Sequence, residues 1–178
     1  MMYLAACLGW FVLTQDSVSP QAKALQDFER QIGDYVNLEK GLAKGTDVTK
    51  PTDQPHLILD RQRELARKIR EARHDAKQGA IFTPAISNEF RRLLGIAMAG
   101  RNDGDIKKSL ARSEPVRLSL HVNETYPAEV PLQSTPPTIL MNLPRLPPEL
   151  EYRINGHALV LRDTNANLVV DLIPDAIP

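Results

Sequence analysis

The chain has 178 residues, of which 42% are hydrophobic and 25% charged, and its 22 basic and 22 acidic residues leave no net charge. This length suits one domain, and the composition is too apolar for a disordered chain. Fourteen prolines and 5% aromatic residues favour an aliphatic core with stiff connections over a large aromatic binding cleft. Residues 17–113 hold 18 Lys/Arg against 13 Asp/Glu, and residues 114–178 hold 4 against 8. So small an asymmetry, with no recognised module, argues against nucleic-acid binding.

The N-terminus predicts export. Tyr3 to Leu13 form an apolar run of eleven residues, too short for a helix that spans a bilayer but suited to the hydrophobic region of a secretory signal. Two features disagree, because no Lys or Arg precedes the run and no Ala-x-Ala site follows it. We expect residues 1–16 to be a signal peptide or N-terminal membrane anchor, with an ordinary buried segment as the alternative. The protein is then exported, periplasmic or envelope-associated, with membrane-surface contact through this N-terminus as an option.

The N-terminal run also contains a match to the bacterial lipoprotein box, Leu4-Ala5-Ala6-Cys7. The apolar stretch continues past Cys7 instead of ending before it, and only three residues precede the box. A chance match is therefore favoured, and the sequence leaves open whether Cys7 is lipidated or removed. If Cys7 is removed, no thiol remains to form a disulfide or bind a metal.

Two long helices are expected next. Ser19-Pro20 is an N-cap followed by a first helical proline, and Gly45 suits the residue just past the helix end. A second helix is predicted over His56–Gln78, with Gly79 as its stop. Because both helices carry two apolar residues in seven, we expect them to pack as an antiparallel hairpin. We interpret the arginine-rich face of the second helix as a solvated face, and the weaker alternative is a basic face that binds an acidic partner or anionic lipid.

Thr83-Pro84 repeats the cap-and-proline signal and begins a third helix, which Gly100 ends. A short fourth helix over Asp103–Arg112 is a further candidate. From Glu114-Pro115 the apolar period switches from 3.6 to 2, which predicts a strand over residues 116–122. A proline-rich stretch over residues 126–148 follows, with one short helix after Thr135 that ends near Leu143.

The last thirty residues predict a three-stranded β-meander. Asn155-Gly156 lies between two strand-like runs and is the preferred pair for a type I′ hairpin turn. Closing the hairpin on this pair sets Leu150 opposite Leu161, Tyr152 opposite Leu159 and Ile154 opposite His157. A loop from Asp163 to Ala166 then returns a third strand, with Leu168 beside Leu161 and Val170 beside Leu159. In this register the apolar side chains of all three strands lie on one face of the sheet.

Residues 146–173 (LPPELEYRINGHALVLRDTNANLVVDLI) and 76–84 (AKQGAIFTP) resemble an uncharacterised family of short exported proteins of Gram-negative bacteria. The likeness covers about a third of the chain. It implies an envelope location and carries over no activity and no functional residues.

Several motifs are better explained as structure than as chemistry. Glu71-Ala72-Arg73-His74 is a single E-x-x-H, whereas a di-iron bundle needs two. Residues 163–167 begin like a calcium loop, but Leu168 stands where Gly is required and Pro174 where Glu is required. We therefore interpret this stretch as a turn.

The sequence predicts no cofactor and no metal site beyond one candidate pair of histidines. His121 and His157 fall on predicted strands, and they are the weak candidates for a metal or pH-sensitive site, since the four histidines show no ligand spacing. The expected fold class is α+β over residues 17–178. Residues 17–113 form a helical hairpin plus one or two further helices, and residues 114–178 form the proline-rich segment and a three- to four-stranded antiparallel β-meander.

The favoured function is a non-enzymatic exported binding or scaffolding protein that acts through an unidentified protein partner. The proline-rich segment and the edge of the third strand are the expected surfaces, and no cofactor is expected. The alternative is a hydrolase or metal-dependent enzyme with a dispersed site near His121, Glu124 and His157.

Overall fold

The computed structural model describes residues 19–46, 50–99, 119–127 and 140–177. Three helices precede a three-stranded antiparallel sheet, so the fold is α+β, as predicted. The elements are α1 (Pro20–Ala43), α2 (Pro55–Ala72), α3 (Pro84–Met98), β1 (Leu150–Asn155), β2 (Ala158–Asp163) and β3 (Leu168–Ile173). The predicted signal segment, the predicted fourth helix, residues 116–118 of the predicted strand and the start of the helix after Thr135 lie outside the described residues.

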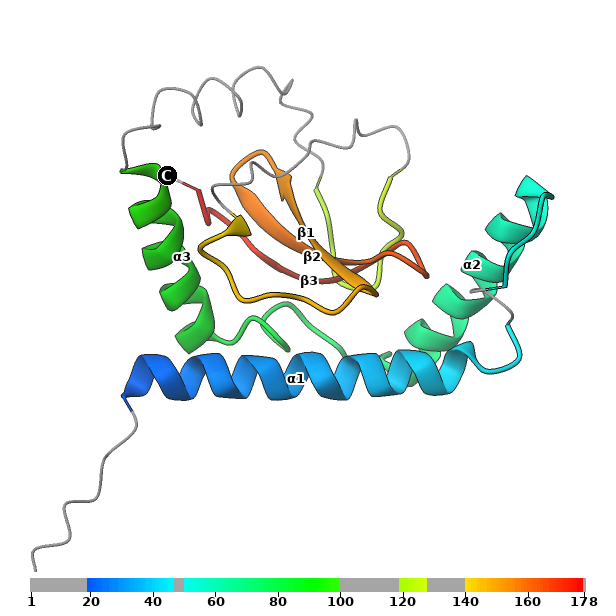
Figure 1. Ribbon diagram of the computed structural model, residues 1–178, viewed down its shortest axis with the longest axis horizontal. Helices are drawn as coiled ribbons and strands as arrows, with labels where there is room; N and C mark the ends of the chain where they lie inside the picture. Colours follow the sequence, from blue (N-terminus) through cyan, green and yellow to red (C-terminus); the bar gives the residue numbers. More distant parts are fainter. Residues whose placement is uncertain (1–18, 47–49, 100–118, 128–139, 178) are drawn as a thin grey trace, which may run out of the picture.

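The helix α1 begins and ends where its capping residues predict. The Ser19 side chain accepts a hydrogen bond from the Ala22 amide at 3.1 Å, and Pro20 is the first helical residue. At the other end Gly45 takes a φ of 84°, a left-handed conformation that glycine adopts without steric cost. Figure 1 shows α1 running beneath the sheet, with α3 and α2 at its two ends.

The helix α2 ends at Ala72, and the prediction that it continues to Gln78 is wrong. After Ala72 the chain turns and crosses toward the sheet, where a carboxylate accepts its backbone N–H groups. Asp171 of β3 binds the amides of Gly79, Ile81 and Phe82 at 2.7 to 2.9 Å. The helical pattern of residues 73–78 is thus overridden by hydrogen bonds to a distant strand.

The helices α1 and α2 contact each other, but α2 is steeply inclined to α1 and its N-terminal part projects away from the rest of the molecule (Figure 1). Its C-terminal half packs inward through Leu65, Ala66 and Ile69, which are buried. One to two turns earlier, Ile58 and Leu59 are 49% and 50% exposed. The apolar stripe of α2 therefore extends beyond the surface that buries it.

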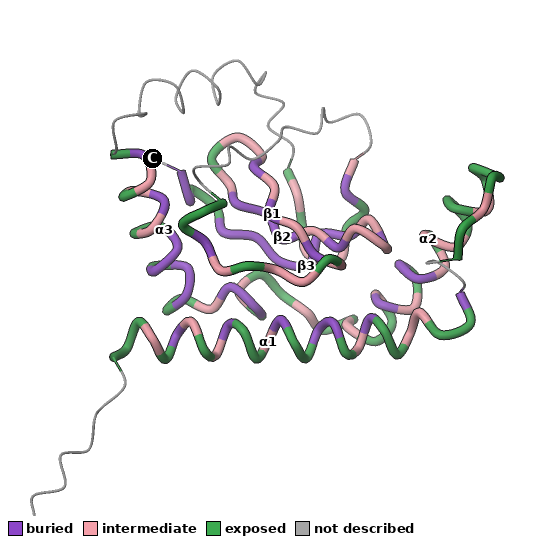
Figure 2. The backbone as a smooth tube through the Cα atoms, in the orientation of Figure 1, coloured by how far each residue is buried: buried purple, intermediate pink, exposed green. Residues whose placement is uncertain are grey.

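An aromatic cluster joins the helices to the sheet. Phe28 of α1 packs edge-on against Phe90 of α3 at a ring separation of 5.1 Å, and Phe82 lies 5.6 Å from Phe90. Tyr152 of β1 extends the cluster, 6.0 Å from Phe90. The core thus has an aromatic centre, although the composition favoured an aliphatic one. Figure 2 shows the buried side of each helix facing the sheet.

The hairpin of β1 and β2 has a different register from the predicted one. Tyr152 pairs with Leu161 and Ile154 with Leu159, so the two-residue loop is Gly156-His157 and not Asn155-Gly156. Gly156 has a φ of 59°, and Asn155 and His157 do not have positive φ. This is the pattern of a type II′ turn, which needs glycine at its first loop position, whereas type I′ needs positive φ at both.

The register between β2 and β3 also differs from the prediction. Leu159 pairs with Ile173 and Leu161 with Asp171, and a bulge follows, after which Asp163 pairs with Leu168. The loop between these strands comprises residues 164–167, not 163–166. A bulge adds one residue to one strand, which a simple alternating pattern does not reveal. The buried face is nevertheless the predicted one, because its members are all buried: Leu150, Tyr152, Leu159, Leu161, Leu168 and Val170.

The outer face of the sheet is covered by residues 119–127. Residues 119–122 do not form the predicted strand, and the chain instead joins the edge of β3 further on. Val169 bonds through its carbonyl to the Asn123 amide at 2.8 Å and through its amide to the Glu124 carbonyl at 2.9 Å, and Thr125 bridges to Leu168. A second small core lies between the two layers, formed by Tyr126, Val160, Val169 and Leu172 with Leu120.

Candidate functional site

His121 lies on an exposed turn and interacts with its own neighbour. Its Nδ1 is 3.1 Å from Oε1 of Glu124, and its backbone amide donates to Oε2 of the same carboxylate at 3.0 Å. Both side chains are at least half exposed. The structure therefore brings together two members of the dispersed site that the sequence suggested, as a local pair spaced three residues apart.

His157 is held at the other end of the sheet, in the hairpin turn. Its Nδ1 is 2.9 Å from the Ile177 carbonyl, and its own carbonyl accepts the amides of Ala176 and Ile177 at 2.8 and 3.0 Å. These bonds fasten the C-terminal segment to the turn. A carbonyl can only accept, so Nδ1 carries the proton and Nε2 is left as an acceptor in the neutral ring.

The hydrogen bonds of the two imidazoles go to different partners and do not join His121 to His157. Among the described residues, no group of three or more His, Cys, Asp or Glu side chains is arranged to hold a metal ion. Glu71 and His74 of the E-x-x-H stretch likewise interact with residues near them in the sequence. Glu71 pairs with Arg67 at 2.6 Å and His74 pairs with Asp75 at 2.9 Å, and all four side chains are exposed.

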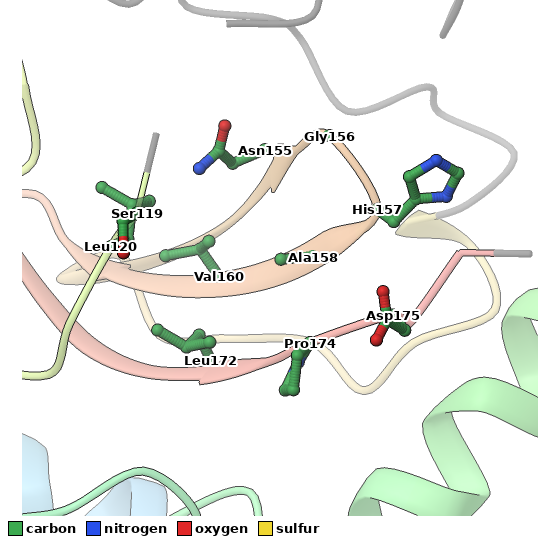
Figure 3. A pocket seen from close by; sticks show the side chains of 10 residues that line it. All are labelled: Ser119, Leu120, Asn155, Gly156, His157, Ala158, Val160, Leu172, Pro174 and Asp175. Atoms are coloured by element: carbon green, nitrogen blue, oxygen red, sulfur yellow. The ribbon is translucent and has the colours of Figure 1, made fainter. Parts of the chain in front are cut away.

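A shallow pocket of about 260 Å³ lies on the outer face of the sheet beside the hairpin turn (Figure 3). Its floor is apolar, formed by Ala158, Val160 and Leu172, and His157 and Asp175 stand at its rim. Pockets that bind drug-sized molecules usually enclose roughly 300–1,000 Å³. This one therefore suits a single side chain or a very small molecule, and neither His121 nor Glu124 lines it.

Buried polar side chains gather on the opposite face, between the helices and the sheet. Tyr35 of α1 donates its hydroxyl hydrogen to Asp163 at 2.7 Å, and the Ala166 amide donates to the other oxygen of that carboxylate at 2.7 Å. Burial raises the pKa of Asp163. Burial is also the main cause that raises the pKa of Tyr35, and the negative charge of Asp163 adds to it. The calcium-like stretch that begins at Asp163 is thus a turn whose first carboxylate faces the core.

Arg73 lies beside this pair at the start of the crossing loop. Its guanidinium stacks over the Tyr35 ring at 5.0 Å and donates to the Asn123 side chain at 3.3 Å and the Val170 carbonyl at 3.2 Å. Burial lowers the pKa of Arg73, and the negative charges of nearby acidic groups oppose that effect. Together these contacts fasten α1, the end of α2 and the segment 119–127 to β3.

Sequence reasoning missed the structural use of Asp171. Its side chain is fully buried and accepts the amides of Gly79, Ile81, Phe82 and Leu172. The signal that could have revealed it is an aspartate inside an otherwise apolar strand, LVVDLI. Its amide partners place residues 79–82 directly against β3.

Comparison of the chain with protein-family models, curated proteins and solved structures gave no match. Within the described ranges, no helix combines the length and the apolar character needed to cross a membrane. The reactive side chains described above are engaged in local pairs or in contacts between elements. Several large apolar side chains of the described residues are exposed, namely Ile58 and Leu59 on α2, Ile96 on α3, and Leu140 and Met141 before β1.

Proposed function

We propose that this protein is an exported, non-enzymatic binding or scaffolding protein that acts through contact with another protein. The observation that carries the proposal is the projecting end of α2, defined here by Ile58 and Leu59. Both side chains are about half exposed, and they continue the stripe whose next members, Leu65 and Ala66, are fully buried. Spacings of seven residues join the exposed and buried members along one helix face.

The charges around the projecting end favour a protein partner over an anionic membrane surface. Arg63 pairs with Asp60 at 3.4 Å, and Arg67 bonds to Glu64 and Glu71 at 2.6 to 2.9 Å. Two of the four arginines of α2, Arg63 and Arg67, are thus paired with carboxylates of the same helix. An apolar strip with a rim of mixed charge suits a hydrophobic groove with a polar border on another protein.

The edge of β3 is a weaker contact surface than the sequence suggested. Residues 123–126 already bond to it through Val169 and Asn167. A paired edge has fewer free backbone groups to offer a partner strand. The projecting end of α2 is therefore favoured over the sheet edge as the contact surface.

The test compares affinity capture from a cell-envelope extract by the wild type and by Ile58→Ser/Leu59→Ser. Exposed substitutions change stability by within about 0.5 kcal/mol, so the double variant should fold and lose the captured protein. Ile96→Ser is the matched control, since Ile96 is 54% exposed on α3, and it should retain the partner. His121→Ala and His157→Ala should retain it as well. Equal capture by all of these variants contradicts the proposal.

A further inference from the structure

Three carboxyl side chains meet where the C-terminal half of α1 faces the β2–β3 loop. Glu39 comes from α1, Glu149 directly precedes β1, and Asp163 ends β2. Glu39 is 1% exposed, Asp163 is fully buried, and the Glu149 side chain is 13% exposed. Figure 1 shows the β2–β3 loop lying above the C-terminal half of α1. We refer to these three residues as the carboxyl cluster.

The members of the carboxyl cluster differ in how well their charges are compensated. Lys40 forms an ion pair with Oε1 of Glu149 at 2.9 Å, but Oε2 of Glu149 is buried without a hydrogen-bond partner among the described residues. Asp163 accepts two hydrogen bonds, from Tyr35 and Ala166.

Glu39 has the least compensation of the three. The side-chain amide of Asn165 donates to its Oε1 at 3.1 Å, and no ion pair joins Glu39 to a cation in the described part of the chain. The neighbouring cation, Lys40, is committed to Glu149. An ionised Glu39 is therefore a buried charge that a single neutral donor stabilises.

Removing an ionised carboxylate from water is costly unless a cation or several donors replace the water. At this contact the facing groups are Asp163 and Glu149, which repel the charge of Glu39, and Lys40, which attracts it. Burial is the main cause that raises the pKa of Glu39, and burial raises that of Asp163 in the same way. Burial also acts to raise the pKa of Glu149, but the bonds to Lys40 and to the backbone hold it below its usual value.

We propose that the contact between α1 and the β2–β3 loop is a pH-sensitive clasp, which tightens when Glu39 is protonated and loosens when Glu39 ionises. Protonation removes the buried charge and its repulsion from Asp163 and Glu149, and the Asn165 amide keeps an oxygen to donate to. The clasp holds the loop that carries Asp163 and Ala166 against α1. A rise in pH therefore weakens one defined junction between the helices and the sheet.

The direction of the pH dependence follows from the raised pKa of Glu39. A group whose pKa is higher in the folded than in the unfolded chain stabilises the fold fully below its unfolded value, roughly 4.3 for Glu. That contribution is lost as the pH rises through the folded value. Asp163 acts in the same direction, whereas Glu149, whose pKa is lowered, loses its contribution as the pH falls. The difference between wild type and a Glu39 variant isolates the Glu39 part.

The experiment measures the urea midpoint of the full chain from about pH 4 to about pH 7.5 for the wild type and Glu39→Gln. Gln has the shape of the protonated acid and can accept from Asn165. We expect the variant to have the higher midpoint at pH 7.5 and the two midpoints to converge near pH 4. Glu29→Gln, at an exposed site on the same helix, should follow the wild type throughout.

A second measurement keeps the proposal testable if Glu39→Gln folds poorly. The side-chain carboxyl carbon of Glu39 is followed by nuclear magnetic resonance during a pH titration of the wild-type protein. Glu39 should titrate above the ordinary value of a glutamate, roughly 4.3. The clasp is ruled out if Glu39 titrates at or below that value, or if Glu39→Gln lowers the midpoint by the same amount at every pH, which is the result of a purely structural role.

Discussion

At the residue scale, Asp171 connects distant parts of the chain. Its buried carboxylate accepts amides from the loop between α2 and α3, and that loop carries Phe82 into the aromatic cluster. A buried carboxylate is stable when several N–H donors replace its lost water. The side chain therefore fixes the path of the crossing loop and, through Phe82, the packing between helices and sheet.

Asp171→Asn should destabilise the fold by about 2–4 kcal/mol. The amide keeps the shape of the carboxylate but presents an NH₂ group to donors that need an acceptor, which leaves buried N–H groups unsatisfied. Urea denaturation near neutral pH measures the loss. Asp175→Asn is the control, because Asp175 is exposed with a φ of 48° and Asn tolerates this conformation. Equal midpoints for both variants would mean that the amides of the loop find other acceptors.

Leu159→Ala should cost about 2–5 kcal/mol, through lost contacts and a residual cavity. Leu159 is fully buried at the centre of the sheet, paired with both Ile154 and Ile173. The loss is again measured by urea denaturation, and Ile96→Ala, at an exposed position of α3, is the reference that should change little. A midpoint for Leu159→Ala equal to that of the reference would contradict the packing of β2 against the helices.

Individual buried residues could be predicted where the pattern is simple. The inward positions of Leu159 and Leu161 follow from alternation, and those of Phe28 and Phe90 from helical spacing. Asp171 and Arg73 could not be placed, because their burial depends on partners about 90 residues away in the sequence. Local rules assign charged side chains to solvent, and only the folded chain supplies the compensating groups.

At the element scale, the alternation of apolar residues specifies which face of the sheet each side chain occupies, but it does not specify how the strands of the hairpin pair. A shift by two residues keeps every side chain on its own face, so the burial pattern is satisfied by both the Asn155-Gly156 and the Gly156-His157 loops. The backbone decides between them, since only Gly156 has a positive φ at the turn. The bulge between β2 and β3 likewise changes which residues of these two strands pair.

A pair of glycine substitutions tests the turn, because the same change should have opposite signs at two sites. Gly156→Ala places a side chain at a φ of 59° and should cost about 1–2 kcal/mol. Gly33→Ala lies within α1 with no atom near the added methyl group, and it should stabilise by about 0.5–1 kcal/mol. Thermal or urea unfolding of both variants measures the two signs. A stabilising Gly156→Ala would show that the turn has another conformation.

Some helix ends are likewise set by local residues and others by residues distant in the sequence. Ser19 and Gly45 fixed both ends of α1 through local capping, which sequence reveals directly. The early end of α2 depends on Asp171 and on the Asn123 side chain, which donates to the Arg73 carbonyl at 2.8 Å. Neither partner is visible in the helical pattern of residues 56–78.

At the scale of the whole molecule, the export prediction concerns residues outside the described part of the chain. The run Tyr3–Leu13 is too short to span a bilayer and long enough for a signal sequence. We expect a mature chain that begins between about Leu13 and Val18, which the intact mass of protein recovered from the periplasm measures. A full-length product in the cytoplasm would contradict this prediction, and a diacylated Cys7 would replace it with the lipoprotein interpretation.

The central claim for the whole molecule is that the projecting end of α2 contacts another protein. It is tested most directly by placing a photocrosslinking amino acid at Ile58, at Leu59 and, as a control, at Ile96, and irradiating intact cells that produce each variant. All three sites are about half exposed, so accessibility is matched and only location differs. We expect one discrete crosslinked product from positions 58 and 59 and none from position 96. No product at 58 and 59, or the same products at all three positions, would contradict it.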